Sequence, residues 1–359
     1  MKIRARTGAL RVGLIGCGSI AQLVHLNILT RLPQVALVAL AEPDPHRRAA
    51  ASQRTPQAAV FADHRELLES SEIEAVVICL PNALHAEVAV AALQHGKHVY
   101  LEKPLATNLD EGRNVLSAWQ RAGVVGMIGF NLRLHALFQE AKQYLHSGRL
   151  GPLVGVRSTR ATAPQSLPAW KLARQSGGGV LLDLASHHLD LVHFLFEQSV
   201  REVYAELRSQ RSEDDSAMLH LRFADGLFVQ SFFSMNAVEE DRFEVYGQAG
   251  KLAVDRYHSL KVEVTDPTHD FSWSGKMKRE LWLFARSPSL WGKLLIPQYE
   301  PSYQVALARF VEAVRTNQPA SPDFWDGYRS LAVIAAAEES ARTGRAVMLA
   351  DLSDEDFAG

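Results

Sequence analysis

The chain has 359 residues, of which 47% are hydrophobic and 22% charged, with a formal net charge of −2. This ordinary globular composition and the length predict two domains, and a charge so close to zero provides no basic field for nucleic acid. No apolar run is long enough for a transmembrane segment, and two cysteines, Cys17 and Cys79, predict no disulfide scaffold and a reducing, cytoplasmic location.

The first predicted element is a short buried strand at 12–15, behind basic residues that lack the apolar core of a signal peptide. Residues 16–21 then read G-C-G-S-I-A, the G-x-G-x-x-A form of the dinucleotide fingerprint. Gly16 permits a tight turn, and Gly18 lets the backbone approach a pyrophosphate. The helix that follows offers its free N–H groups to the phosphates.

A second apolar strand, residues 35–41, ends at Glu42, which lies 24 positions past Gly18. This is near the spacing of the acid that binds the adenosine ribose hydroxyls. Strand and fingerprint together therefore predict a dinucleotide site.

Strands and helices continue to alternate up to residue 128. Further buried strands are predicted at 74–80, 97–101 and 123–128, with helices beginning at Pro45 and spanning 83–95 and 108–122. This alternation predicts a doubly wound parallel sheet in a Rossmann domain, residues 1–128. Ligands bind beyond the carboxyl ends of such strands, where Glu42, Asn82 and Lys103 fall.

The pattern changes after Phe130. Strands with period-two alternation are predicted at 154–161, 200–209, 217–223, 228–235 and 242–246, with a hairpin turn at 224–226. Helices are predicted at 134–145, 180–196, 302–316 and 326–343. Residues 129–359 are therefore expected to form an α+β domain with a large, mostly antiparallel open sheet.

Three residues are candidates for catalysis. Lys103 precedes Pro104, which restricts its backbone or permits a cis bond, and it lies at the strand end facing the expected nicotinamide. Asp183 and His187 are four apart and share a helix face. A carboxylate that orients a histidine suits a general base, although a capping or packing pair remains an equal alternative.

The same predicted helix carries His188, Asp190 and His193, which raises the alternative of a zinc site. His187 and His193 fall on different faces, and no third ligand stands at a diagnostic spacing, so we predict no metal. His188 is either a second substrate contact or a polar core residue. His25 is expected to be a packing residue.

Three motifs together carry a family resemblance: G-x-G-x-x-A at 16–21, E-K-P at 102–104, and G-G-G at 177–179 leading to D-x-x-x-H at 183–187. Over nearly its whole length the chain resembles the glucose–fructose oxidoreductase/inositol dehydrogenase family (Gfo/Idh/MocA). The resemblance implies a Rossmann domain, a C-terminal open-sheet domain that often builds an oligomer interface, and hydride transfer between a nicotinamide cofactor and a hydroxyl carbon of a sugar, cyclitol or related compound.

The resemblance also implies residue roles. Lys103 would be the catalytic lysine, and Asp183 and His187 the substrate-side pair. The N-x-R segment at 131–133 places Arg133 at the substrate, and P-N-x-x-H at 81–85 matches the segment beside the cofactor. The expected cofactor contacts are Gly16, Gly18, Ser19, Ile20, Glu42, Leu80, Asn82, His85, Glu102 and Lys103.

The chain departs from the family pattern at the ribose-binding acid. Glu42 replaces the commoner aspartate and is followed by Asp44. An acid here favours NAD, because it repels the 2′-phosphate of NADP. The nearby Arg47 and Arg48 leave NADP as the weaker alternative.

A second departure is an insertion at 266–301, in which apolar and basic residues interleave. It contains Trp273, Trp282 and Trp291, half of the six tryptophans. So much apolar area predicts burial on its own subunit, a subunit interface or lid, or a membrane-surface contact, which its prolines disfavour. We expect a homo-oligomer in which a partner buries this segment.

The predicted function is an NAD-dependent oxidoreductase acting on a polyhydroxylated small molecule. His187 would take the hydroxyl proton, Asp183 would orient His187 or bind a neighbouring hydroxyl, and Lys103 would stabilise the alkoxide-like charge. The alternatives are an NAD-assisted glycosidase, which returns its cofactor unchanged, and a catalytically dormant NAD-binding sensor. The intact Lys103, Asp183 and His187 argue against the sensor.

Overall fold

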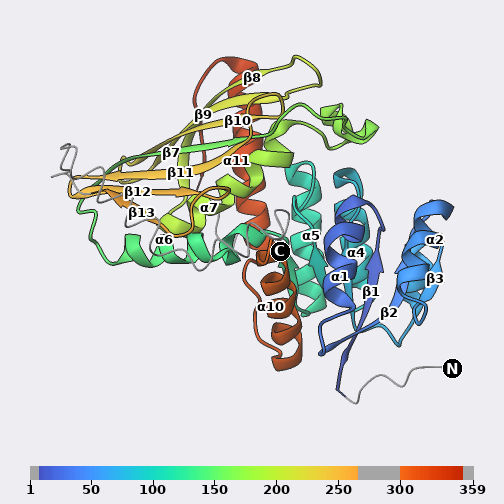
Figure 1. Ribbon diagram of the computed structural model, residues 1–359. Coiled ribbons are helices and arrows are strands. Elements are labelled where there is room, and N and C mark those ends of the chain that lie inside the picture. Colours follow the sequence, from blue (N-terminus) through green and yellow to red (C-terminus); the bar gives the residue numbers. More distant parts are fainter. Residues whose placement is uncertain (1–7, 266–299, 351–359) are drawn as a thin grey trace.

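The computed structural model describes residues 8–265 and 300–350, which fold into two sheets with flanking helices (Figure 1). Sheet A contains six parallel strands in the order β3-β2-β1-β4-β5-β6. These strands are β1 (Leu10–Ile15), β2 (Val35–Ala41), β3 (Ala59–Phe61), β4 (Ala75–Ile78), β5 (His98–Leu101) and β6 (Gly126–Ile128). The predicted doubly wound parallel sheet is confirmed.

Helices cover both faces of sheet A, and the central strands are accordingly apolar throughout, as in β4, where every residue is buried. The helical segments are η1 (Ala21–His25), α1 (Leu26–Leu29), α2 (Pro45–Arg54), α3 (His64–Glu69), η2 (Asn82–Leu84), α4 (His85–Gln94) and α5 (Leu109–Ala122). Side chains of Asp44 and Asn108 cap α2 and α5 by accepting backbone N–H groups. The strand order reverses between β1 and β4, which opens a ligand crevice at their carboxyl ends.

Sheet B contains eight strands in the order β13-β12-β11-β7-β10-β9-β8-β14, and only the β7–β10 pair is parallel within it. The strands are β7 (Leu153–Ala161), β8 (Val200–Arg208), β9 (Ser216–Phe223), β10 (Phe228–Ser234), β11 (Glu240–Gly247), β12 (Gly250–Asp255), β13 (Glu263–Thr265) and β14 (Val347–Met348). The expected large, mostly antiparallel sheet is therefore present.

The remaining helices pack on one face of sheet B or return to sheet A (Figure 1). They are η3 (Asn131–Leu134), α6 (Ala136–His146), η4 (Ala169–Lys171), η5 (Arg174–Ser176), η6 (Leu181–Ala185), α7 (Ser186–Phe196), α10 (Ser302–Thr316) and α11 (Phe324–Thr343). In both η1 and η6 the hydrogen bonds follow the wider π pattern, which occurs often at functional sites.

Helix α10 belongs to the later part of the chain but packs against the Rossmann sheet. Its Ala306, Leu307 and Phe310 share a buried core with strands β1 and β4. The Phe310 ring meets Tyr100 of β5 edge to face, with centroids 5.8 Å apart. Sheet A is thus completed by a helix more than two hundred residues downstream of β1.

The predicted insertion at 266–301 lies outside the described residues except for Glu300 and Pro301. Across residues 8–265 and 300–350, no helix combines the length and apolar character that crossing a bilayer requires.

Candidate active site

The fingerprint turn after β1 is shaped for a phosphate group. Gly16 has a φ of +87°, and a Cβ there would lie 2.3 Å from the carbonyl oxygen of Cys79. A Cβ on Gly18 would meet nothing within 4 Å, so the space above it is open. Ser19 and Ile20 follow as the first residues of the helix, whose N–H groups face an incoming anion.

Glu42 closes this turn from the end of β2. Its carboxylate accepts the backbone N–H of Cys17 at 2.7 Å and that of Asp44 at 3.0 Å, and it is almost fully buried. Arg47 pairs with the same carboxylate at 3.2 Å, and Arg48 donates to the carbonyl of Glu42 at 2.6 Å. Arg47 is therefore engaged with the carboxylate and Arg48 with the backbone beside it, which matches the expected preference for NAD.

A cavity of about 390 Å³ opens beside Glu42, between the ends of β2 and β4. Pro43, His64, Leu80 and Leu84 are among the residues that line it. The lining is mainly apolar, with Asp63, Arg65 and Glu87 also present, and a cavity of this size suits an adenine ring. Turn, acid and cavity together fit NAD.

Two residues that follow β4, Asn82 and His85, hold neighbouring segments in place. Asn82 donates from Nδ2 to the carbonyl of Gly177 at 2.8 Å, which ties the Rossmann sheet to the glycine-rich turn before η6. The two ring nitrogens of His85 lie 2.6 Å from the Pro104 carbonyl and 2.9 Å from that of Leu80. Burial lowers the pKa of His85. Both side chains therefore hold backbone segments in position beside the crevice at the carboxyl ends of the strands.

Lys103 follows β5, and its bond to Pro104 is cis. The Lys103 ammonium donates to the Asp183 carbonyl at 2.8 Å and lies 3.5 Å from the Asp183 carboxylate. Burial lowers the pKa of Lys103. Behind it, Glu102 lies 2.7 Å from Nε2 of the fully buried His25. His25 is thus a packing residue, as expected, that also supports the E-K-P segment.

Asp183 stands in η6 between two lysines. Its Oδ2 accepts a hydrogen bond from Lys171 at 2.7 Å, on the side opposite to the Lys103 contact. Burial opposes ionisation of Asp183, but Lys103 and Lys171 outweigh it and lower its pKa to about 2. The sequence analysis does not identify Lys171, because the lysine stands six residues before Gly177 and reaches Asp183 only through the packing of the glycine-rich turn.

His187 is buried one turn further along, with its ring 6.2 Å from that of Phe130. Its Nδ1 makes no hydrogen bond to any described residue. Burial, with the positive charges of Lys103 and Arg160, holds the pKa of His187 well below its ordinary value. The imidazole is therefore neutral at pH 7 and able to accept a proton. Asp183 contacts Lys103 and Lys171, and it does not orient the His187 ring.

Two residues that are predicted to contact the substrate, His188 and Arg133, have polar partners of their own within the protein. His188 is buried, bonds to Asp241 at 3.0 Å and packs edge-on against Phe233, so it is the polar core residue of the two alternatives. The buried Arg133 donates to Asp190 at 2.8 Å and pairs with Asp326 at 3.0 Å. Its Nε and Nη2 donors are engaged in ion pairs within the protein, and the substrate contact of Arg133 stays a prediction.

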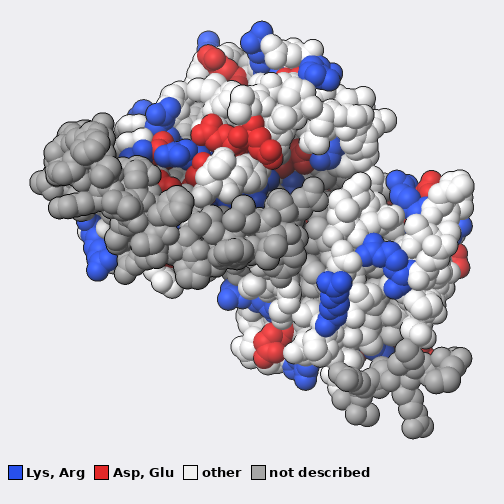
Figure 2. Space-filling view, viewed as in Figure 1, with Lys and Arg blue, Asp and Glu red and all other residues white. Residues whose placement is uncertain are grey.

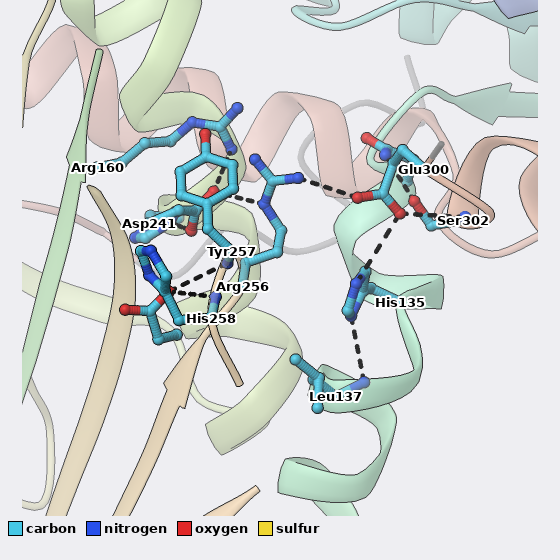
Figure 3. A network of polar contacts seen from close by, with 12 residues as sticks. His135, Leu137, Arg160, Asp241, Arg256, Tyr257, His258, Glu300 and Ser302 are labelled. Carbon is cyan, nitrogen blue, oxygen red and sulfur yellow. Dashed lines mark hydrogen bonds and ion pairs between the residues drawn. The ribbon is translucent and has the colours of Figure 1, made fainter. Parts of the chain in front are cut away.

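A second polar network lies on the inner face of sheet B (Figure 3). Asp241, fully buried on β11, accepts from Arg256 Nε at 2.7 Å and lies 3.4 Å from Nη1 of Arg160. Arg256 continues to Glu300 at 2.9 Å. The described residues hold no cluster of three or more histidine, cysteine or acidic side chains suited to a metal.

Comparisons with known proteins agree with this geometry. Residues 10–130 match the family model of the Gfo/Idh/MocA oxidoreductases with an NAD-binding Rossmann fold, and residues 138–253 match the C-terminal domain model of the same family. Myo-inositol 2-dehydrogenase of Thermotoga maritima is 27% identical over 353 residues, covering 96% of this chain and 99% of that protein.

Two further relatives are similar over comparable lengths. The scyllo-inositol 2-dehydrogenase (NAD⁺) of Bacillus subtilis is 24% identical, covering 94% of this chain and 96% of that protein. A solved levoglucosan dehydrogenase, in complex with NADH and levoglucosan, superposes with a TM-score of 0.81 at 25% identity, covering 95% of this chain and 99% of that one. The chain belongs to the Gfo/Idh/MocA family and is an NAD-dependent oxidoreductase.

Proposed function

We propose that this enzyme oxidises a hydroxyl carbon of a sugar, cyclitol or sugar derivative, or reduces the matching ketone. The observation that carries the proposal is the convergence of a largely buried lysine, Lys103, and a neutral buried histidine, His187, beyond the carboxyl end of β5. NAD, bound along the fingerprint crevice, supplies a hydride acceptor for such a carbon. The inositol and levoglucosan dehydrogenases named above support this substrate class.

Each polar residue then has one task. His187 takes the hydroxyl proton, which its neutral form permits. The Lys103 ammonium stabilises the negative charge that develops on the oxygen. Asp183 holds the ammonium groups of Lys103 and Lys171 in place through its carbonyl and carboxylate.

The test is a turnover screen of sugars, cyclitols and nucleotide sugars, followed by NADH absorbance at 340 nm. We expect at least one polyol to give stoichiometric NADH, and Lys103→Met to abolish it while NADH binding is retained. Release of a sugar with no net NADH would instead support the NAD-assisted glycosidase. Failure of every polyol to reduce NAD would contradict the proposal.

We also propose that the enzyme works as a homo-oligomer in a reducing compartment such as the cytoplasm. The described helices leave one face of sheet B uncovered, and Met218 and Phe228 are exposed on the outer side of its strands. Cys17 and Cys79 are both free and buried, which suits a reducing environment. On the face seen in Figure 2, basic and acidic side chains are mixed without a broad basic field.

A further inference from the structure

Arg160 is a buried cation that the proposed chemistry leaves without a task. It lies on β7, next to Phe233 of β10 and Asp241 of β11 in the sheet register. Its side chain is only 14% exposed and approaches Asp241 on the inner face of sheet B (Figure 3). The alternation along β7 turns it inward, whereas Arg157 on the same strand is exposed.

The hydrogen-bond donors of Arg160 are largely unused. Its Nη1 is 3.4 Å from the Asp241 carboxylate, yet Nε and Nη1 are both buried with no hydrogen bond to any residue within the described ranges. Asp241 accepts its hydrogen bonds from Arg256 at 2.7 Å and from His188 at 3.0 Å. Buried donors without an acceptor are costly and rare, so a bound acceptor is the natural explanation.

Arg160 also lies within electrostatic reach of the catalytic group. After burial and Lys103, its charge is the next cause that lowers the pKa of His187, and it contributes in the same way to the lowered pKa of Asp183. Asp183 is already shared between Lys103 and Lys171. Lys103, Lys171 and Arg160 therefore outnumber Asp183 and Asp241, the two carboxylates that they face.

We propose that Arg160 binds a carboxylate of the substrate, so that the enzyme acts on a sugar acid in preference to the neutral sugar. The inference rests on the function proposed above and names its substrate class. The planar guanidinium matches the two oxygens of a carboxylate. The single positive charge of Arg160 suits a monoanion, whereas a dianionic phosphate would be repelled more strongly by Asp183 and Asp241 nearby.

The experiment compares acids with their neutral parents: D-glucuronate with D-glucose, D-galacturonate with D-galactose, and D-gluconate with D-glucitol. NADH formation is measured for the unmodified enzyme, Arg160→Gln and the matched control Arg157→Gln. We expect one acid to exceed its parent in kcat/KM, and Arg160→Gln to lower that value about 10- to 100-fold, the usual range for a charged hydrogen bond. Arg157→Gln should leave the ratio of acid to parent unchanged.

Calorimetric titration of the same acids into the NADH-loaded enzyme separates this inference from the proposed function. Arg160-dependent binding of an acid without NADH formation from any polyol would sustain the carboxylate site and contradict the oxidation. Turnover of neutral polyols, with no acid bound or preferred, would sustain the proposed oxidation and contradict the carboxylate site. The inference is also overturned if Arg160→Gln weakens acid and parent equally, or if D-glucose 6-phosphate is preferred to every acid.

Discussion

At the level of single residues, the site depends on which groups carry protons. His187 acts as a base only when neutral, and burial lowers its pKa, so activity should fall only as the pH drops well below 6.5. Lys103 acts only when protonated, and its lowered pKa places the alkaline limb below 10.5. The two limbs enclose a plateau of activity around neutral pH.

Replacing His187 tests the acid limb. His187→Gln removes the proton acceptor and should lower kcat/KM about 10²- to 10⁴-fold, the usual contribution of general acid–base catalysis. The remaining activity should also lose its decline at low pH. Both effects are measured by NADH formation across a pH series, with His146→Gln, a partly exposed helix-end histidine, as the control. Retention of the acid limb in His187→Gln would assign that limb to another group.

Glu42 tests the choice of cofactor. Glu42→Gln removes the negative charge but keeps an oxygen that can accept the N–H of Cys17. Without repulsion of the 2′-phosphate, and with Arg47 released from its ion pair, NADP binding should strengthen relative to NAD. Fluorescence titration with NADH and NADPH measures the ratio of the two dissociation constants. An unchanged ratio would show that specificity resides elsewhere in the adenosine cavity.

At the level of elements, helix α7 is held to the start of the second domain by the ion pair between Asp190 and Arg133. Asp190 is 1% exposed, and its loss would leave a buried arginine with Asp326 as its only carboxylate partner among the described residues. We expect Asp190→Ala to reduce the free energy of unfolding by about 3 to 5 kcal/mol. Urea unfolding measures the difference.

The matched control for this ion pair lies on the surface of α11. Arg342 pairs with Glu339 one turn away and is 72% exposed, so Arg342→Ala should change stability by less than about 1 kcal/mol. Equal losses for Asp190→Ala and Arg342→Ala would mean that burial of the Asp190 pair contributes nothing beyond a surface contact.

How far the sequence predicts these elements depends on their length and burial. The limits of α10 match the predicted helix at 302–316, because its apolar period is strong. Strand β3 and helix α3 were missed, because they are short and β3 is largely exposed. Strands β13 and β14 were also missed, since they are short edge strands, and so was the internal strand β12, whose burial pattern does not alternate regularly.

The candidate site could also be predicted only in part from the sequence. Glu42 and Lys103 could be placed because the carboxyl ends of parallel strands share one edge. Arg160 and Lys171 could not, since their positions depend on how sheet B and the glycine-rich turn pack together. Arg133 was placed at the substrate because the N-x-R segment at 131–133 resembles the family pattern, and that segment does not reveal its pairing with Asp190, 57 residues further along the chain.

For the whole molecule, the uncovered face of sheet B predicts how copies associate. Met218 lies opposite Phe232 across β9 and β10, and Phe228 is half exposed on the same two strands. Met218→Glu with Phe228→Glu should place charges in the proposed interface and shift the protein to a smaller species by light scattering. The control, Leu23→Glu on the exposed side of η1, should leave the mass unchanged. An unchanged mass in the double variant would remove sheet B from the interface.

The return of α10 to sheet A has a consequence for synthesis of the protein. A chain emerging from the ribosome builds β1, β4 and β5 early, but the side chains that cover their apolar surface, among them Phe310, come last. Until then the nascent nucleotide-binding half must carry an open hydrophobic face. Truncation before residue 302 would therefore leave a cofactor domain that is complete in sequence but unfinished in its core.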